Sequence, residues 1–287
     1  MKTISVAHSP DADDIFMYYA IKFGWVTPND AKFENIADDI ETLNQAILKG
    51  DYDICAISFA LYPFVKDDYA LLKTAVSFGE GYGPKLIKRK GTKLKRNFKV
   101  ALSGEYTTNA LLFKIAYPDA RITYMNFLDI EQAVINGDVD AGVLIHESIL
   151  TYDDSLEVEK EMWDIWVQLS GGNLPLPLGG MCIRRSIPLH AAIDYEDTLI
   201  KAVNVANKNR KVLAPMLLDK GLIRVDADTL DNYLDLYAND NSVQLSDIQY
   251  KALDKLFELG YKNGFYTELV KSQDFLIPSE YKELRQK

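Results

Sequence analysis

Four short polar segments of the sequence each follow an apolar, strand-like stretch and precede a helical pattern. They span residues 9–14, 58–60, 103–108 and 146–148. Together they offer an imidazole, several carboxyls and several hydroxyls, the side-chain types that move protons and bind polar ligands. In an open parallel sheet the carboxyl ends of the strands share one edge, and ligands bind there. We therefore expect the four segments to converge on one cleft.

His146 is the main candidate for acid–base chemistry. It closes the apolar stretch 141–145, and the chain has three histidines. An imidazole titrates near neutral pH, so it can take up or release a proton under working conditions. A structural histidine that caps the end of a strand explains the spacing equally well. His190 is expected at the surface, whereas His8 directly follows the first strand and faces either the cleft or the core.

Thr107 and Thr108 stand at the start of the helical pattern 109–117. Hydroxyls and free N–H groups at a helix N-terminus form a small site for an anion or a polyol. A plain N-cap is at least as good an interpretation of the two threonines. Ser58, at the end of its own strand, has the same two interpretations.

An acidic cluster and two cysteines suggest metal or redox chemistry only weakly. Asp11, Asp13 and Asp14 could bind a metal ion, but carboxylates in the first turn of a helix also complement its dipole. We favour the interaction with the helix dipole over metal binding, because no His or Cys accompanies the three aspartates at a metal-ligand spacing. Cys55 and Cys182 build neither a disulfide framework nor a metal cage.

The motifs of several common enzyme classes do not occur in the sequence. It has no Gly-x-Gly-x-x-Gly after a strand, no Walker loop and no Cys-x-x-Cys. It also lacks the Gly-x-Ser-x-Gly elbow of serine hydrolases. Most aromatic residues are expected in the core, but Phe59, Tyr106 and Tyr152 border the predicted cleft, where a flat aromatic substrate would stack.

An internal sequence repeat predicts two related units. Residues 45–53 (QAILKGDYD) and 132–140 (QAVINGDVD) share a helix end, a glycine stop, an Asp-x-Asp turn and the start of an apolar strand. Residues 6–9 and 100–103 also match, and both lead into a helix. Such alternation predicts an α/β fold with a mostly parallel sheet, and the second unit begins near residue 97. The last third reads mainly as helices, over 191–220, 227–237 and 246–262.

Two strand-like segments that end in basic residues are expected to carry the chain between two lobes. The predicted domains are residues 1–90 with 186–287 for the first lobe and 91–185 for the second. The C-terminal helices then pack back on the first lobe. Two lobes joined by two crossings suit hinge closure on a ligand.

Composition excludes several function classes. The chain of 287 residues is 48% hydrophobic, with 32 basic and 42 acidic residues and a net charge of −10. The acidic balance argues against a nucleic-acid partner, which needs a positive field. No apolar run approaches the roughly 20 residues that span a bilayer, so no membrane role is expected. The N-terminus enters a strand without a signal-peptide pattern, so we expect a cytoplasmic protein that acts on a small molecule.

The sequence resembles the MqnD family, the 1,4-dihydroxy-6-naphthoate synthases of the futalosine route to menaquinone. The shared motifs occur in family order with similar spacing. They are SPxxxDxF from Ser9, DIETLN at 39–44, SFALY at 58–62, GYGP at 81–84, GEYTT at 104–108, HESILTY at 146–152 and LPLPLG at 174–179. The resemblance is close over about two thirds of the chain, and the last two blocks are the most specific.

The resemblance implies a two-lobed fold like that of the type II periplasmic binding proteins. It implies cyclic dehypoxanthinylfutalosine as substrate and 1,4-dihydroxy-6-naphthoate as product, with neither a metal nor an organic cofactor. His146 would be the proton acceptor in a base-initiated carbon–carbon cleavage. The expected substrate-binding residues are Ser9, Asp14, Ala56, Ile57, Ser58, Thr107 and Thr108.

The chain departs from the family pattern at two places. Family members often read Ser-Pro-Cys-Pro-Asn-Asp where this chain has residues 9–14, and often have a lysine in place of Ala56. A lost positive charge there would weaken a contact with a substrate carboxylate. Two alternatives to the synthase are the chorismate dehydratase of the same pathway and a solute-binding protein that catalyses nothing. The block at 146–152 favours the synthase over the dehydratase, and the missing signal peptide counts against the binding protein.

Overall fold

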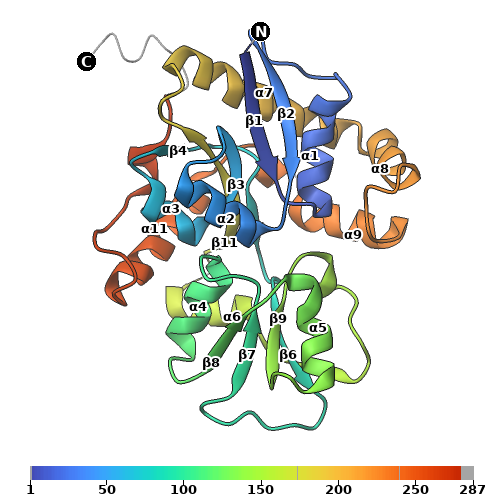
Figure 1. The fold of residues 1–287 in the computed structure, drawn as a ribbon, viewed down its shortest axis with the longest axis vertical. Helices are drawn as coiled ribbons and strands as arrows, with labels where there is room; N and C mark the ends of the chain where they lie inside the picture. The colour runs from blue at the N-terminus through green and yellow to red at the C-terminus, as the bar shows by residue number, and fades with distance from the viewer. Residues whose placement is uncertain (1, 173, 239, 279–287) are drawn as a thin grey trace.

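A computed structural model describes residues 2–172, 174–238 and 240–278 of the chain. The strands form two sheets, one above the other in Figure 1, with helices on their faces. The strands of the first sheet are β1 (Lys2–His8), β2 (Ala31–Ala37), β3 (Ile54–Ser58), β4 (Tyr69–Leu71), β5 (Ser77–Gly79) and β11 (Leu176–Arg184). The strands of the second sheet are β6 (Lys85–Arg89), β7 (Lys99–Leu102), β8 (Arg121–Tyr124), β9 (Ala141–Leu144) and β10 (Leu156–Glu161).

Helices connect and cover these strands. The α-helices before β11 are α1 (Ala12–Lys22), α2 (Ile40–Lys49), α3 (Tyr62–Val65), α4 (Thr108–Ala116), α5 (Phe127–Asn136) and α6 (Met162–Ser170). Those after it are α7 (Leu189–Lys208), α8 (Arg210–Asp219), α9 (Ala227–Tyr237), α10 (Asp240–Val243) and α11 (Asp247–Lys262). Three short 3-10 helices are η1 (Phe59–Leu61), η2 (His146–Ile149) and η3 (Ser272–Phe275).

The predicted repeat is confirmed by the pairing of the strands. β1 lies between β2 and β3 and is parallel to both, as β7 is to β8 and β9. Helices α2 and α5 end at Gly50 and Gly137, whose φ values of 76° and 83° are left-handed and favour glycine. The strand after each helix then pairs in parallel with the first strand of its own unit, β3 with β1 and β9 with β7. The two similar sequences therefore fold into two similar α/β units.

Each of the two crossings between sheets lies one strand earlier than predicted. Strand β6 pairs antiparallel with β9 in the second sheet, and β11 pairs antiparallel with β3 in the first. The chain thus changes sheet before Lys85 and again before Leu176, so the predicted boundaries at residues 90 and 185 are displaced. The local sequence pattern predicts that both segments are the last strands of their units. Their pairing partners lie far away in the sequence, and a local pattern does not identify such partners.

The C-terminal helices pack mainly on the first sheet and its helices, as expected. Helix α7 packs along α1, α9 contacts α1 and β5, and α11 contacts β11 and also α6 of the second unit. The helical pattern at 191–220 forms two helices, because the helix is interrupted at Asn209. Within the described ranges, no helix is both long enough and apolar enough to cross a bilayer.

Candidate active site

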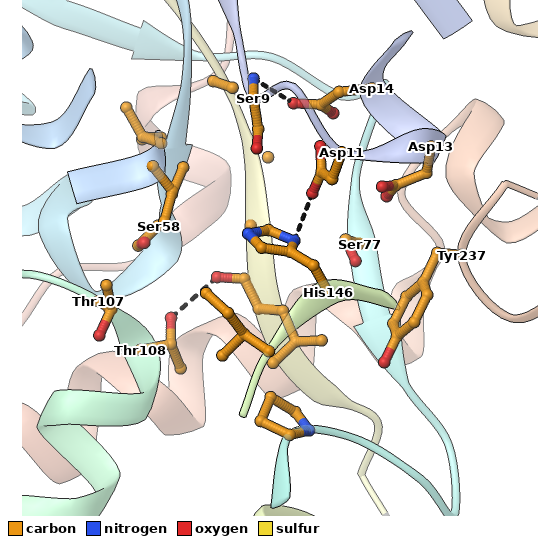
Figure 2. A pocket seen from close by; sticks show the side chains of 18 of the residues that line it. Ser9, Asp11, Asp13, Asp14, Ser58, Ser77, Thr107, Thr108, His146 and Tyr237 are labelled. Atoms are coloured by element: carbon orange, nitrogen blue, oxygen red, sulfur yellow. Dashed lines mark hydrogen bonds and ion pairs between the residues drawn. The ribbon is translucent and has the colours of Figure 1, made fainter. Parts of the chain in front are cut away.

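A cavity lies between the two sheets, beyond the carboxyl ends of β1, β3, β7 and β9, in the kind of place where α/β folds bind small molecules. Its lining includes every residue that we predicted as a site residue. These are Ser9, Asp14, Ala56, Ile57, Ser58, Thr107, Thr108 and His146. The four polar segments therefore converge, as expected from the rule for parallel sheets. Figure 2 shows the side chains that meet there.

His146 lies at the centre of this group of side chains (Figure 2). It directly follows β9 and Ile145 and has φ = 54°, a left-handed conformation that costs energy for a residue with a Cβ atom. Its Nδ1 lies 2.5 Å from Asp11 Oδ2, and its ring packs edge-on against Phe127 with the ring centroids 4.9 Å apart. Its Nε2 is buried and has no hydrogen-bond partner among the described residues. One ring nitrogen is therefore held, and the other is available in the cavity.

Asp11 precedes α1 at the N-cap position, yet its side chain makes no capping hydrogen bond. The carboxylate pairs with His146 instead, with only 7% of the side chain exposed to solvent. The dipole interpretation of the acidic cluster therefore misses the partner of Asp11. The other two acids behave differently: Asp14 accepts a hydrogen bond from the backbone N–H of Ser9 at 2.8 Å, and Asp13 Oδ1 has no partner among the described residues.

Burial and the short contact between Asp11 and His146 shift the pKa values of the groups in this pocket. Burial alone would lower the pKa of His146, but the Asp11 carboxylate, with Glu147 and Asp13, raises it above its ordinary value. Burial opposes ionisation of Asp11, yet His146 and its hydrogen bond hold the pKa of Asp11 below its ordinary value. Burial and the neighbouring Asp11 raise the pKa values of Asp13 and Asp14 well above normal. Of the three acids, Asp11 is therefore the one whose ionised form the surroundings favour.

Thr107 has the structural role that the sequence left open. Its hydroxyl accepts a hydrogen bond from the backbone N–H of Ala110 at 3.1 Å and donates one to the carbonyl of Gly104, so it is the N-cap of α4. Thr108 donates its hydroxyl hydrogen to the carbonyl of Leu178 at 2.9 Å. Both hydroxyl hydrogens are therefore used inside the protein. What this corner can offer a ligand is the N–H groups of Thr108 and Asn109, the first two residues of α4, because the N–H of Ala110 is already capped.

Ser58 differs from the two threonines, because its hydroxyl hydrogen is not used by its neighbour. Asn44 is fully buried and holds the serine from two sides. The Asn44 side-chain oxygen accepts from Ser58 N at 3.0 Å, and its Nδ2 donates to Ser58 Oγ at 3.1 Å. Ser58 Oγ thus accepts from the protein and keeps its own hydrogen to donate into the cavity.

Glu147, the residue after His146, fastens the second unit to the first. Its Oε1 accepts from the backbone N–H of Ala12, at the start of α1, at 2.9 Å. Its Oε2 lies 3.5 Å from Nη2 of Arg224, which stands between α8 and α9. The Arg224 guanidinium also lies over the ring of Phe127, 5.2 Å from its centroid. The sequence does not predict these contacts, because no pattern around Arg224 indicates that it lies close to Glu147 and His146.

The aromatic residues of the cavity are not those that we expected. Tyr233 and Tyr237 of α9 line it, and burial raises the pKa of both phenols well above normal. Phe59 is instead fully buried against Phe78, and Tyr106 packs on Phe64 outside this cavity. Tyr152 lies under the ammonium group of Lys85. The helical spacing of the two α9 tyrosines is typical of a core face, so the sequence carried no signal that they line a site.

The described part of the chain contains no group of three or more His, Cys, Asp or Glu side chains arranged to hold a metal ion. The carboxyl of Asp11 pairs with His146 and that of Asp14 accepts from the N–H of Ser9, so these two carboxyls have separate partners. What the cavity offers is a partly engaged imidazole, a hydroxyl donor and helix N–H groups.

Comparison with known proteins places the chain in a family. A family model described as menaquinone biosynthesis matches residues 4–262. The chain belongs to this family. A 1,4-dihydroxy-6-naphthoate synthase from Streptomyces coelicolor is 30% identical over 274 residues, which are 93% of this chain and 96% of that protein. The family predicted from the sequence motifs is therefore confirmed.

Solved structures confirm the predicted fold class. A crystal structure of a protein from Archaeoglobus fulgidus is 33% identical, with a TM-score of 0.85, and the match covers 92% of this menaquinone-biosynthesis chain and 98% of the other. The alkanesulfonate-binding protein of Xanthomonas axonopodis pv. citri matches with a TM-score of 0.70 at 14% identity, over 96% and 98% of the two chains. The fold is therefore that of the periplasmic binding proteins, with two α/β units.

Proposed function

We propose that this chain is a 1,4-dihydroxy-6-naphthoate synthase, a carbon–carbon lyase that acts on cyclic dehypoxanthinylfutalosine in menaquinone biosynthesis. Membership of the family and the relative named above support the reaction. The observation that carries the proposal is the imidazole of His146, whose Nε2 is buried in the cavity without a partner among the described residues. An imidazole so placed is suited to take a proton from a bound molecule.

In the proposed reaction, neutral His146 removes a proton from the sugar-derived ring of the substrate. A C–H bond breaks and an N–H bond forms at Nε2. The electron pair moves into the ring system, and the carbon–carbon bond to the small polyol fragment breaks. The imidazolium then protonates the departing fragment, which balances the step and restores the base. Because the bicyclic product becomes aromatic, the protein mainly has to place a base and exclude water.

The substrate is proposed to lie with its carboxylate toward the N-terminus of α4 and its reacting ring toward His146. The first-turn N–H groups of α4 attract an anion through their partial positive charge. The hydroxyl of Ser58 can donate in the same direction, next to Ala56 and Ile57. At the other end, the carboxylate of Asp11 repels an anion and favours the positive charge that develops on His146.

Closure of two lobes is part of the proposal. We divide the described residues into a first lobe (2–84, 176–238 and 240–278) and a second lobe (85–172 with 174 and 175), following the membership of the two sheets. A two-lobed fold with two crossings can open to admit substrate and close to exclude water. The proposed ligand is a small molecule rather than a nucleic acid, in keeping with the net charge of −10, and the proposed compartment is the cytoplasm.

Incubation of the purified protein with each candidate substrate tests the proposal. Appearance of naphthoate absorbance from cyclic dehypoxanthinylfutalosine supports it, whereas loss of chorismate indicates the dehydratase. Binding of either molecule without turnover indicates a binding protein. We expect His146→Asn to lower kcat by about 10²–10⁴-fold, and His190→Asn, at an exposed histidine, to leave kcat unchanged. Full turnover by His146→Asn would remove the histidine from the proposed role.

A further inference from the structure

Asp11 and His146 come from different halves of the molecule. Asp11 follows β1 of the first sheet, and His146 follows β9 of the second. Their side chains meet at 2.5 Å and are almost completely buried, with 7% and 14% of their surface exposed. A buried ion pair is costly to assemble unless its geometry is good, so a pair that bridges two units requires an explanation beyond simple stability.

Asp11 stands at the N-cap position of α1 but does not cap the helix with its side chain. At the N-cap of α1 its carboxylate would normally accept from the first N–H groups of the helix, but it makes no such bond. Glu147 serves the N–H of Ala12 in its place. The carboxylate of Asp11 is thereby left free to point at the imidazole (Figure 2).

We propose that Asp11 is a positioning residue for the base, resting on the synthase function proposed above. Its carboxylate accepts the Nδ1 hydrogen of His146 and so fixes the tautomer in which the Nε2 lone pair faces the cavity. The same carboxylate stays paired with the imidazolium that forms when the substrate proton is taken. The base is therefore complete only when the β1 segment and the β9 segment are brought together.

Three features of His146 support this role. Its backbone has the left-handed conformation with φ = 54°, which the surroundings must hold in place. Phe127 packs against one edge of its ring and limits its rotation. Among the described residues Nε2 has no competing partner, so the bond at Nδ1 alone decides which nitrogen carries the hydrogen.

Other charged and titratable groups lie around the Asp11–His146 pair or line the cavity, and they must be counted when the titration of His146 is interpreted. They come from β1, from α1, from η2, from the segment before α9, and from α9 itself. They are His8, Asp13, Asp14, Glu147, Arg224 and Tyr233. Substituting Asp11 also removes the charge that raises the pKa values of Asp13 and Asp14, so the tautomer of His146 is the readout specific to the pair.

The test compares Asp11→Asn and Asp11→Ala with a matched control, Asp30→Asn, at an exposed aspartate remote from the pocket. We expect both Asp11 variants to lower kcat by about 10²–10⁴-fold, as loss of an orienting carboxylate does in other histidine bases. KM should change little, because Asp11 does not hold the substrate. The acid limb of the pH–kcat profile should move to lower pH, because removal of the negative charge lowers the pKa of His146.

Nitrogen-15 NMR of the imidazole gives a readout that needs no substrate. In the wild type we expect the Nδ1–H tautomer and titration of His146 above the ordinary range. In Asp11→Ala we expect the tautomer preference to be lost and titration to move to lower pH. Wild-type kcat in both Asp11 variants, or an unchanged tautomer and titration, would overturn the proposal. If the wild type makes no naphthoate but the NMR changes are seen, the proposed synthase function is refuted, whereas the proposed effect of Asp11 on the His146 tautomer is supported.

Discussion

Replacing Glu147 by alanine should lower the free energy of unfolding by about 2–3 kcal/mol. The larger part is the bond from the N–H of Ala12, a charge-assisted hydrogen bond in a buried place, for which losses of about 1.5–3 kcal/mol are usual. The ion pair with Arg224 adds about 0.5 kcal/mol or less, because the arginine side chain is 37% exposed and its field is screened by water.

Urea unfolding of a set of variants checks this magnitude. Glu147→Gln keeps an oxygen that can accept from Ala12 but loses the charge, so we expect a loss of about 1 kcal/mol. The double-mutant cycle with Arg224→Ala should give a coupling energy below about 1 kcal/mol. The reasoning is refuted if the glutamine variant loses as much as the alanine variant. A coupling energy above that bound would mean that the arginine, and not the helix N–H, is the main partner.

Three further predictions concern the site and the strand that carries it. The kcat of the proposed reaction should fall as the pH drops through the pKa of His146, which Asp11 raises above its ordinary value, and a midpoint below that ordinary value would contradict this. Thr107→Val should lower the free energy of unfolding by about 1 kcal/mol, because the N–H of Ala110 loses its cap, and Thr107→Ser should restore it in the same urea experiment. Gly142→Ala should lower Tm, because a Cβ would lie 2.5 Å from the Ile130 side chain; an unchanged Tm would mean that α5 can move away from β9.

The contents of the cavity could be predicted from the sequence because they depend on local patterns. Each strand was marked by its apolar run, and the rule for parallel sheets put the residues after the strands at one edge. Ser58 and His146 were found in this way although they belong to different sheets. The repeated helix–glycine–strand sequence also predicts that the two sheet edges are built alike. The equivalent parallel pairings, β3 with β1 and β9 with β7, agree with this prediction.

The remaining features depend on contacts that no local pattern contains. Strands β6 and β11 pair antiparallel with partners far away in the sequence, so the local pattern predicts each crossing one strand too late. Tyr233 and Tyr237 have the spacing of a core face, and what puts them on the cavity is the packing of α9 against α1 and β5. The pairing of Asp11 with His146 likewise needs both sheets in place.

The two interpretations of His146 that the sequence left equal are not exclusive in the structure. Nδ1 is engaged as in a structural histidine, because it is held by a buried carboxylate at 2.5 Å. Nε2 is engaged by none of the described residues and lies at the cavity. A base that must deliver its lone pair in one direction needs this division, since without the bond at Nδ1 the ring could turn away or carry its hydrogen on Nε2. The structural bond at one nitrogen is thus what makes the other nitrogen available for chemistry.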